Sequence, residues 1–245
     1  MILCIDSGNT RLKWGIHDGD AWQAHGALAK GDLLQLAGVL PRQGSLQRAI
    51  ISNVAGENVA DVLRVTLPVP RDAVQFVQAA AAAGGVRNGY RIPARLGVDR
   101  WCALIGARSL TPHPCIVVGA GTATTIDTLS ADGAFQGGVI LPGFDLMRAA
   151  LSSNTAQLPL AEGRWHPFPK QTEDAIVSGC IEAQVGAIER AYRRIAANPA
   201  AECLLFGGAA SRLQPHLSAP HRVVEHLVLE GLLRLATAEA LPAKE

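Results

Sequence analysis

The first hundred residues alternate short apolar runs with turn residues and stretches of helical periodicity. Ile2–Ile5 is a continuous apolar run, which is typical of a buried strand. Arg11–His17 alternates, with its large apolar residues on one face, as a half-buried strand does. Because Ser7-Gly8-Asn9 between them forms turns readily, the two runs predict a β-hairpin. The pattern also predicts strands over Trp22–Ala27 and Ala49–Ser52, and helices over Asp32–Leu40, Val59–Leu67 and Gly97–Leu110.

The second half of the chain repeats this plan. Cys115–Val118 is an apolar strand, Gly119-Ala120-Gly121-Thr122 is a glycine-rich turn, and Ala123–Leu129 alternates like the outgoing strand of a hairpin. Two halves that each begin with strand, turn and two further strands before their helices predict an internal duplication. The remaining expected elements are a strand over Ala134–Leu141, helices from Pro142 to Leu151 and over Glu173–Ala197, a strand over Cys203–Phe206, and a helical tail after Glu225.

The boundary between the halves is expected at Thr111-Pro112-His113-Pro114, because two prolines cannot continue a helix. The sequence therefore predicts an α/β protein with one domain over residues 1–113 and a similar one over residues 114–245. Between the first strands and the hinge, Ala79–Ala83 and Arg87–Pro93 have no clear period and are expected to form a loop.

Composition narrows the class of protein. Hydrophobic residues make up 49% of the chain and charged residues 18%, which excludes a disordered chain. The 22 basic and 21 acidic side chains leave a net charge of +1, so nothing favours nucleic acid or an anionic membrane as a partner. The five cysteines are odd in number and have no CxxC spacing, which indicates reduced, buried thiols. No apolar stretch is long enough to span a bilayer, and a cytosolic protein is expected.

The segment Asp6–Lys13 is the first candidate for chemistry. Backbone N–H groups in a tight turn form a concavity for anions, and a glycine at position 8 lets a phosphate approach closely. Thr10 and Lys13 supply a hydroxyl and a positive charge, and Asp6 at the strand end is suited to a hydrated Mg²⁺. A plain hairpin turn has the same composition, and on composition alone it is the more frequent interpretation.

Three further segments carry possible chemistry. Gly119–Thr125 resembles a second phosphate-contacting hairpin, or else a turn followed by a β-branched strand. In Gly97-Val98-Asp99-Arg100, the acid could act as a general base held ionised by the guanidinium, or the pair could be a salt bridge at a helix start. Gly207-Gly208 after a strand could receive a flat ring. Tyr90 is the aromatic residue expected to contact a ligand, and the histidines lack zinc-binding spacing.

Taken together and in order, these segments resemble the type III pantothenate kinases, a family whose members include the Bvg accessory factors. Asp6-Ser7-Gly8-Asn9-Thr10 is similar to the family's DxGNT motif, and Gly97-Val98-Asp99-Arg100 to its GxDR motif. The remaining matches are Gly121-Thr122-Ala123-Thr124-Thr125, Gly137-Gly138-Val139-Ile140-Leu141-Pro142-Gly143, and Gln171-Thr172 with Ala175-Ile176-Val177-Ser178-Gly179. The resemblance extends to about residue 210.

The resemblance implies a fold and a reaction. The fold would be two ribonuclease-H-like, actin-like ATPase domains from an internal duplication, as in acetate and sugar kinases. The reaction would be ATP-dependent phosphorylation of pantothenate to 4'-phosphopantothenate, the first step of coenzyme A biosynthesis. The family is homodimeric and uses Mg²⁺ with K⁺ or ammonium, so ATP, pantothenate and a second copy would be the partners.

The resemblance also assigns residues. Asp99 matches the catalytic base, and Thr172 matches a substrate contact that crosses the dimer interface. The matches to ATP contacts are Asp6, Ser7, Gly8, Asn9, Thr10, Arg11, Leu12, Lys13 and Thr122. The matches to pantothenate contacts are Tyr90, Gly97, Val98, Asp99, Arg100 and Thr172.

One departure from the family motif concerns its cation. Gly119 stands where the family usually has an aspartate that binds the monovalent cation, and glycine supplies no charge. Gln171 in place of asparagine keeps the amide. Two alternatives therefore remain: a kinase of the same fold for another small hydroxyl substrate, and a regulatory nucleotide-binding protein with weak or no turnover. Gly119 favours the regulatory protein, whereas Asp6, Asp99 and Lys13 count against it.

Overall fold

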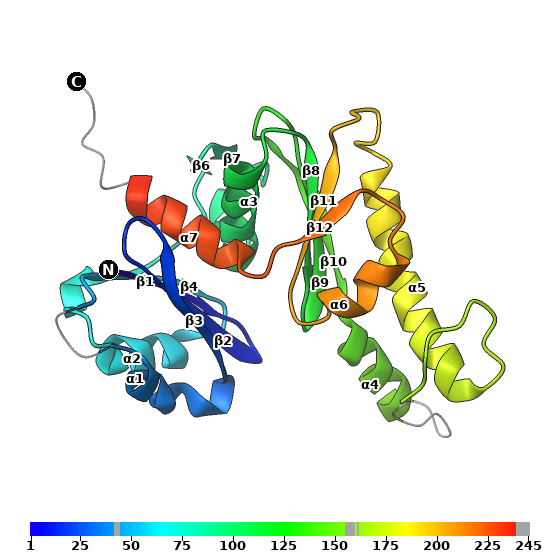
Figure 1. The fold of residues 1–245 in the computed structure, drawn as a ribbon, viewed down its shortest axis with the longest axis horizontal. Helices are drawn as coiled ribbons and strands as arrows, with labels where there is room; N and C mark the ends of the chain where they lie inside the picture. Colours follow the sequence, from blue (N-terminus) through cyan, green and yellow to red (C-terminus); the bar gives the residue numbers. More distant parts are fainter. Residues whose placement is uncertain (42–44, 155–159, 161, 239–245) are drawn as a thin grey trace. The chain divides into compact units, whose positions relative to one another are not determined.

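The computed structural model describes residues 1–41, 45–154, 160 and 162–238 (Figure 1). The chain forms two compact units, a first unit of Met1–Leu110 with the chain from His226 onward, and a second unit of Thr111–Glu225. The predicted boundary at residue 113 is close to this division, but the predicted second domain extended to residue 245. The difference is the last helix, α7 (Leu227–Ala238), which packs on α3 (Val98–Leu110) and on the sheet of the first unit.

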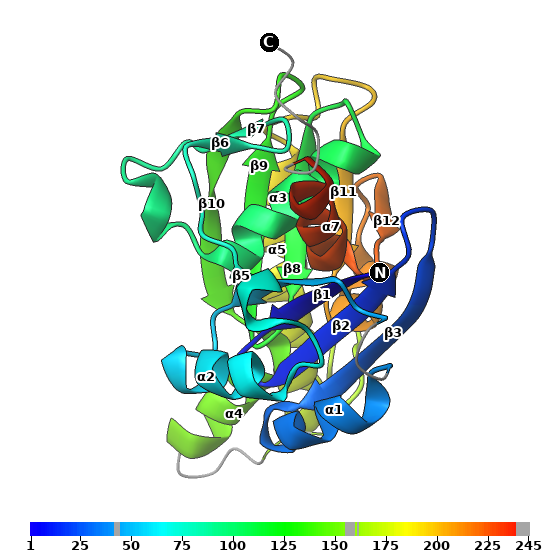
Figure 2. The same cartoon turned by 90° about the vertical axis from the view of Figure 1, so that its left-hand side faces the viewer.

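The first unit is a mixed five-stranded sheet with helices on both faces. The strands are β1 (Ile2–Ser7), β2 (Arg11–His17), β3 (Trp22–Ala29), β4 (Arg48–Asn53) and β5 (Val74–Phe76), in the order β3-β2-β1-β4-β5. The pairs β1–β2 and β2–β3 are antiparallel, whereas the pairs β1–β4 and β4–β5 are parallel. One face packs on α1 (Leu36–Val39) and α2 (Glu57–Thr66), and α3 and α7 cover the other (Figure 2).

The second unit has the same sheet topology. Its strands are β8 (Cys115–Ala120), β9 (Ala123–Leu129), β10 (Phe135–Pro142), β11 (Glu202–Phe206) and β12 (His221–Val223), in the order β10-β9-β8-β11-β12. Each strand has the direction of its counterpart in the first unit, so the predicted duplication is confirmed. The helices α4 (Phe144–Asn154), α5 (Thr172–Tyr192) and α6 (Ala210–Leu213) enclose a hydrophobic core against one face of this sheet (Figure 1).

Short elements account for most differences from the sequence prediction. The expected loop contains a small hairpin, β6 (Ala82–Ala83) with β7 (Val86–Arg87), whose turn residues Gly84 and Gly85 have positive φ. The short strand β5, just before that loop, was not predicted. The helix expected over Asp32–Leu40 is a 3₁₀ segment, Lys30–Gln35, followed by the single turn α1. The remaining 3₁₀ turns are Arg71–Ala73, Pro93–Arg95 and Gln214–His216.

Two glycines let α3 and α7 meet backbone to backbone in the first unit. A Cβ atom at Gly231 of α7 would lie 1.8 Å from the carbonyl oxygen of Cys102 in α3. A Cβ atom at Gly106 of α3 would lie 2.2 Å from the carbonyl oxygen of Leu227. Because both obstacles are backbone atoms, a side chain at either position must push the helices apart.

We therefore expect Gly231→Ala to lower the free energy of unfolding by about 2–4 kcal/mol, despite the better helix propensity of alanine. Gly186→Ala is the matched control, because Gly186 also lies within a helix and its Cβ would meet no atom within 4 Å. That control should be neutral or slightly stabilising. Urea unfolding of both variants makes the comparison, and equal stabilities would contradict the close helix contact.

Candidate active site

Two carboxylates in the first unit influence each other electrostatically near the end of β1. Asp6 lies near the end of that strand, and Asp99 lies in the first turn of α3. Burial raises the pKa of Asp6 to about 6, and repulsion by the Asp99 carboxylate adds to this rise. The Lys13 ammonium and the Ser52 hydroxyl lower the same pKa, but they do not offset it. The two motifs that contain these aspartates, far apart in sequence, therefore form one electrostatic site.

The hairpin that follows Asp6 is the predicted phosphate segment. Asp6 pairs with Lys13 across β1 and β2, and the Gly8 N–H donates to the Arg11 carbonyl at 3.0 Å to close the turn. Asn9, Thr10 and Arg11 are exposed at its tip, whereas Asp6, Gly8 and Lys13 are half-buried. The side chains of Ser7 and Leu12 are buried. Leu12 lies in the hydrophobic core of the first unit, so only its backbone is free to meet a ligand.

Gly97 shapes the start of α3 around the Asp99 carboxylate. The Gly97 carbonyl accepts the first helical hydrogen bond, from the Trp101 N–H at 2.9 Å. Oδ1 of Asp99 accepts a bond from the Arg100 N–H at 2.9 Å. A Cβ atom at position 97 would lie 2.7 Å from that same oxygen. The motif glycine therefore leaves room for the carboxylate, while half-buried Val98 is the first residue of the helix.

Tyr90 and Arg100, two of the predicted substrate residues, are joined directly. Nη1 of Arg100 donates to the Tyr90 hydroxyl at 2.8 Å, and the guanidinium lies 5.7 Å from the centroid of the tyrosine ring. Asn88 fixes the tyrosine backbone, because its Oδ1 accepts a bond from the Tyr90 N–H at 3.0 Å. Arg100 is buried, so the pair brings a fixed positive charge next to Asp99.

In the second unit, the glycine motifs converge where β8 ends. The carbonyl of exposed Thr122 accepts a bond from the Gly143 N–H at 2.9 Å. A Cβ atom at Gly143 would lie 2.1 Å from the Gly121 carbonyl oxygen. Gly207, at φ +102°, approaches Ala120 so closely that a Cβ atom would be 2.3 Å from its carbonyl oxygen. Three motifs separated in sequence therefore form one open corner of backbone around Thr122.

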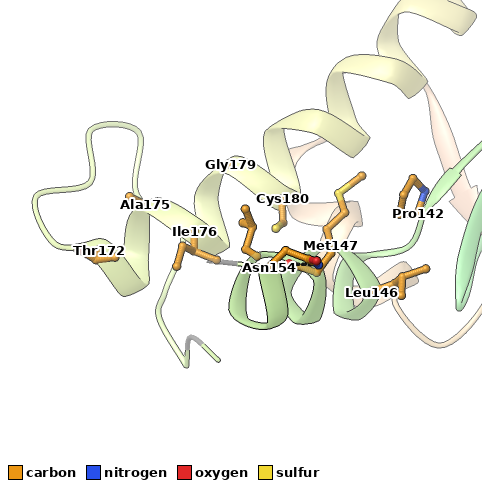
Figure 3. A pocket seen from close by; sticks show the side chains of 11 residues that line it. Pro142, Leu146, Met147, Asn154, Thr172, Ala175, Ile176, Gly179 and Cys180 are labelled. Atoms are coloured by element: carbon orange, nitrogen blue, oxygen red, sulfur yellow. Dashed lines mark hydrogen bonds between the residues drawn. The ribbon is translucent and has the colours of Figure 1, made fainter. Parts of the chain in front are cut away.

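Thr172 lies at the first position of α5. It borders an apolar pocket of about 820 Å³ between α4 and α5 (Figure 3). The side chains of Met147, Ile176 and Cys180 line the same pocket. Gln171, next to Thr172, uses its amide to donate to Oδ2 of Asp174 at 2.7 Å. The sequence did not predict this pocket.

Comparison with known proteins identifies the family. The family model described as type III pantothenate kinase matches residues 2–194. A type III pantothenate kinase of Aromatoleum aromaticum is 52% identical over 240 residues, which cover 98% of this chain and 99% of that protein. The chain belongs to the type III pantothenate kinase family. This confirms the resemblance of the motifs, and it makes the chain a kinase that acts on pantothenate.

Solved structures of similar fold compare with this pantothenate kinase over nearly its whole length. A conserved Baf family protein from Campylobacter jejuni has a TM-score of 0.68 at 20% identity, covering 97% of this chain and 98% of that one. A protein from Sinorhizobium meliloti assigned to the 2-dehydro-3-deoxygalactonokinases has a TM-score of 0.60 at 15% identity, covering 98% and 99%. At these identities the likeness shows the fold alone, and it confirms the predicted duplicated fold.

Sequence reasoning about this pantothenate kinase missed two residues that contact the site. Ser52 of β4 lies opposite Asp6 in the parallel register and lowers the pKa of that carboxyl. The sequence feature that could have identified Ser52 is a small polar residue at the end of an apolar run. Phe206 of β11 covers Gly119 of β8, and a Cβ atom at Gly119 would lie 2.8 Å from Cζ of the ring. The sequence feature that could have identified Phe206 is an aromatic residue directly before Gly207-Gly208.

The cysteines and helices of this kinase add two observations. All five cysteines are buried and none forms a disulfide, and burial raises the pKa of the Cys102 and Cys203 thiols above the ordinary range. They are therefore packing residues rather than nucleophiles.

Within the described ranges of the chain, no helix has the length and apolar character needed to cross a membrane.

Proposed function

We propose that this chain transfers the γ-phosphoryl group of ATP to the primary hydroxyl of pantothenate, giving ADP and 4'-phosphopantothenate. This is the first step of coenzyme A biosynthesis. The feature that supports the assignment to these residues is the electrostatic repulsion between Asp6 and Asp99, which links the phosphate-type hairpin to the carboxylate at the start of α3. Membership of the type III pantothenate kinase family supports the choice of substrate.

Asp99 is the proposed general base. Its carboxylate accepts the proton of the pantothenate hydroxyl as that oxygen forms a bond to the γ-phosphorus, and the bond from phosphorus to the ADP oxygen breaks. The Arg100 N–H bond and the gap at Gly97 hold the carboxylate in one orientation. Because phosphoryl transfer needs positioning more than covalent help from the protein, this fixed orientation is the main contribution of the helix start.

The other predicted residues take binding roles. For ATP we propose the backbone of the hairpin with Thr10 and Lys13, together with Thr122 in the second unit. For pantothenate we propose Tyr90 and Arg100, since a buried guanidinium suits the carboxylate of that acid. The full set of residues proposed to bind ATP is Asp6, Ser7, Gly8, Asn9, Thr10, Arg11, Leu12, Lys13 and Thr122.

The first unit has the charge needed for Mg²⁺. Asp6 and Asp99 repel each other, and Lys13 and Ser52 only partly offset the repulsion, so a divalent cation beside Asp6 would relieve it. The described residues contain no group of three His, Cys, Asp or Glu side chains placed to hold a metal. We therefore propose that Asp6 holds a hydrated Mg²⁺ through water, with phosphate oxygens as the other ligands. When bound, the ion neutralises charge on the phosphates.

We also propose that the kinase works as a homodimer through the α4–α5 pocket. Two apolar side chains on α4 are exposed beside it, Leu146 at 47% and Leu151 at 37%, and Ile140 on β10 is exposed at 62%. Exposed apolar side chains beside an apolar pocket are typical of a protein interface. Thr172 at the rim of the pocket would then reach the pantothenate site of the partner copy.

Replacing Leu146 with glutamate should convert the dimer to monomer, because a charge would be buried in the apolar interface. Leu34→Glu is the control, since Leu34 is exposed at 75% on the first unit and away from this pocket. Sedimentation velocity measures both variants. A Leu146→Glu protein that sediments as wild type would place the interface elsewhere.

Five reduced, buried thiols suit a reducing compartment, and we propose that the kinase acts in the cytoplasm.

The function itself is tested by ADP release with MgATP and pantothenate, and by mass spectrometry of the product. We expect ADP release that requires pantothenate and a product heavier by one phosphoryl group. Folded protein that releases no ADP in response to pantothenate would overturn the proposal. Turnover with another small hydroxyl acid, but not with pantothenate, would redirect the substrate assignment.

A further inference from the structure

Gly119 lies near the end of β8, the middle strand of the second sheet, and next to the corner proposed for ATP. It is in β8, where it pairs with Thr125 of β9 on one side and Phe206 of β11 on the other. A Cβ atom at this position would lie 2.8 Å from Cζ and 3.3 Å from Cε1 of the Phe206 ring. It would also lie 2.9 Å from Oγ1 of Thr125. The volume that a side chain at position 119 would enter is therefore already filled.

The groups that fill this volume are poor partners for a cation. The Phe206 atoms nearest to Gly119 are ring carbons, which supply no oxygen ligand. Cations such as K⁺ are held by several oxygen ligands that replace their water. At position 119 the chain supplies no side-chain oxygen, and the Thr125 hydroxyl beside it is a single neutral ligand. The residues present do not fit the monovalent cation that the family resemblance implies.

We infer that this kinase requires no monovalent cation, because the Phe206 ring occupies the space in which a carboxylate at position 119 would hold one. The inference rests on the proposed kinase activity, and it gives Gly119 and Phe206 a joint role. A glycine at 119 is needed for the ring to lie over β8, and the ring closes the gap that the glycine leaves. Neither residue alone accounts for the absence of an ion site.

The pairing predicts how the site could be rebuilt. Gly119→Asp alone would force the new Cβ atom against Phe206 and Thr125, so its carboxylate would enter a crowded position. Phe206→Ala alone would open space without supplying charge. The double variant Gly119→Asp/Phe206→Ala supplies both the space and the carboxylate, and we expect it alone to respond to K⁺.

The first experiment measures pantothenate-dependent ADP release at constant ionic strength, with KCl or NH₄Cl against tetramethylammonium chloride. We expect wild-type turnover to be the same in all three salts. We expect the double variant to be activated about 5–10-fold by K⁺. Activation of the wild-type enzyme by K⁺ or ammonium of that size would overturn the inference.

The second experiment measures K⁺ binding in the absence of turnover. Thermal unfolding with MgADP is followed in KCl and in tetramethylammonium chloride, since an ion bound to the native state raises the melting temperature. No difference between the salts is expected for wild type, and a rise in KCl is expected for the double variant. A K⁺-specific rise in wild type would overturn the inference even if no turnover were found. Folded protein that is inactive in every salt would contradict the proposed function instead, and the melting data would still decide whether the ion binds.

Discussion

Replacing Asp99 with asparagine is expected to lower kcat by about 10²–10⁴-fold, with little change in KM for ATP or pantothenate. Asparagine keeps the shape of the side chain and its Oδ1 acceptor, so the bond from the Arg100 N–H can survive. The basic oxygen that takes the hydroxyl proton is lost. Steady-state kinetics, with each substrate varied in turn while the other is saturating, measures the effect.

Glu57→Gln is the matched control for this variant. Glu57 is also an acid in the first turn of a helix of the first unit, and it pairs with Arg64 at 2.7 Å on the surface. Its loss should leave kcat unchanged. If Asp99→Asn turned over at the wild-type rate, the proton would have to leave the hydroxyl by another route, and the assignment of the base would be wrong.

Replacing Asp6 with asparagine is expected to stabilise the Mg²⁺-free protein while it damages turnover. The native pKa of Asp6 is raised from the model-peptide value of 3.8 to about 6. Between these values the native state binds more protons than the unfolded state, so stability falls as pH rises through that window and stays low above it. Asparagine carries no charge at any pH. The variant should therefore gain about 1–3 kcal/mol at pH near 7.5, and its stability should depend less on pH between about 4 and 6.

Urea unfolding of wild type and variant in Mg²⁺-free buffer, at pH values below and above this window, measures the difference. Asp18→Asn is a control of opposite sign. The pKa of Asp18 is lowered by bonds from the Ala21 and Asp20 N–H groups, so its ionised form adds stability that is lost as pH falls. A stability difference between wild type and Asp6→Asn that did not change with pH would contradict the raised pKa. Full activity of Asp6→Asn would contradict its proposed place beside the Mg²⁺.

Local patterns were sufficient for the hairpins of the fold. Arg11–His17 and Ala123–Leu129 have the bounds that the alternation predicted, because a period of two fixes both the strand and its buried face. Strands of three residues, such as β5, are too short to show any period. The helical tail after Glu225 was predicted and is α7, but a local pattern does not say which sheet a helix packs on.

The site was less accessible to physical reasoning from the sequence. Composition alone left Asp6–Lys13 as an ordinary turn and Asp99 as a helix-start acid. Only the order of the motifs, through a family resemblance, linked them before the structure did. The covering of Gly119 by Phe206 depends on the register between β8 and β11, which no local pattern encodes. The contact of Ser52 with Asp6 likewise follows from the pairing of β1 with β4.

The return of α7 to the first unit has a consequence for biosynthesis. The second unit is one continuous stretch of chain, Thr111–Glu225, whereas the first unit needs both Met1–Leu110 and the helix after His226. During translation, the residues that surround Asp6 and Asp99 are synthesised first. The unit that contains them is the last to fold completely, because α3 lacks its partner helix until α7 leaves the ribosome. The second unit has all of its residues earlier. A nascent chain stalled before residue 226 would therefore carry every proposed catalytic group and still expose the α3 surface around Gly106. We expect such a chain to bind chaperones through this surface and not to bind ATP productively.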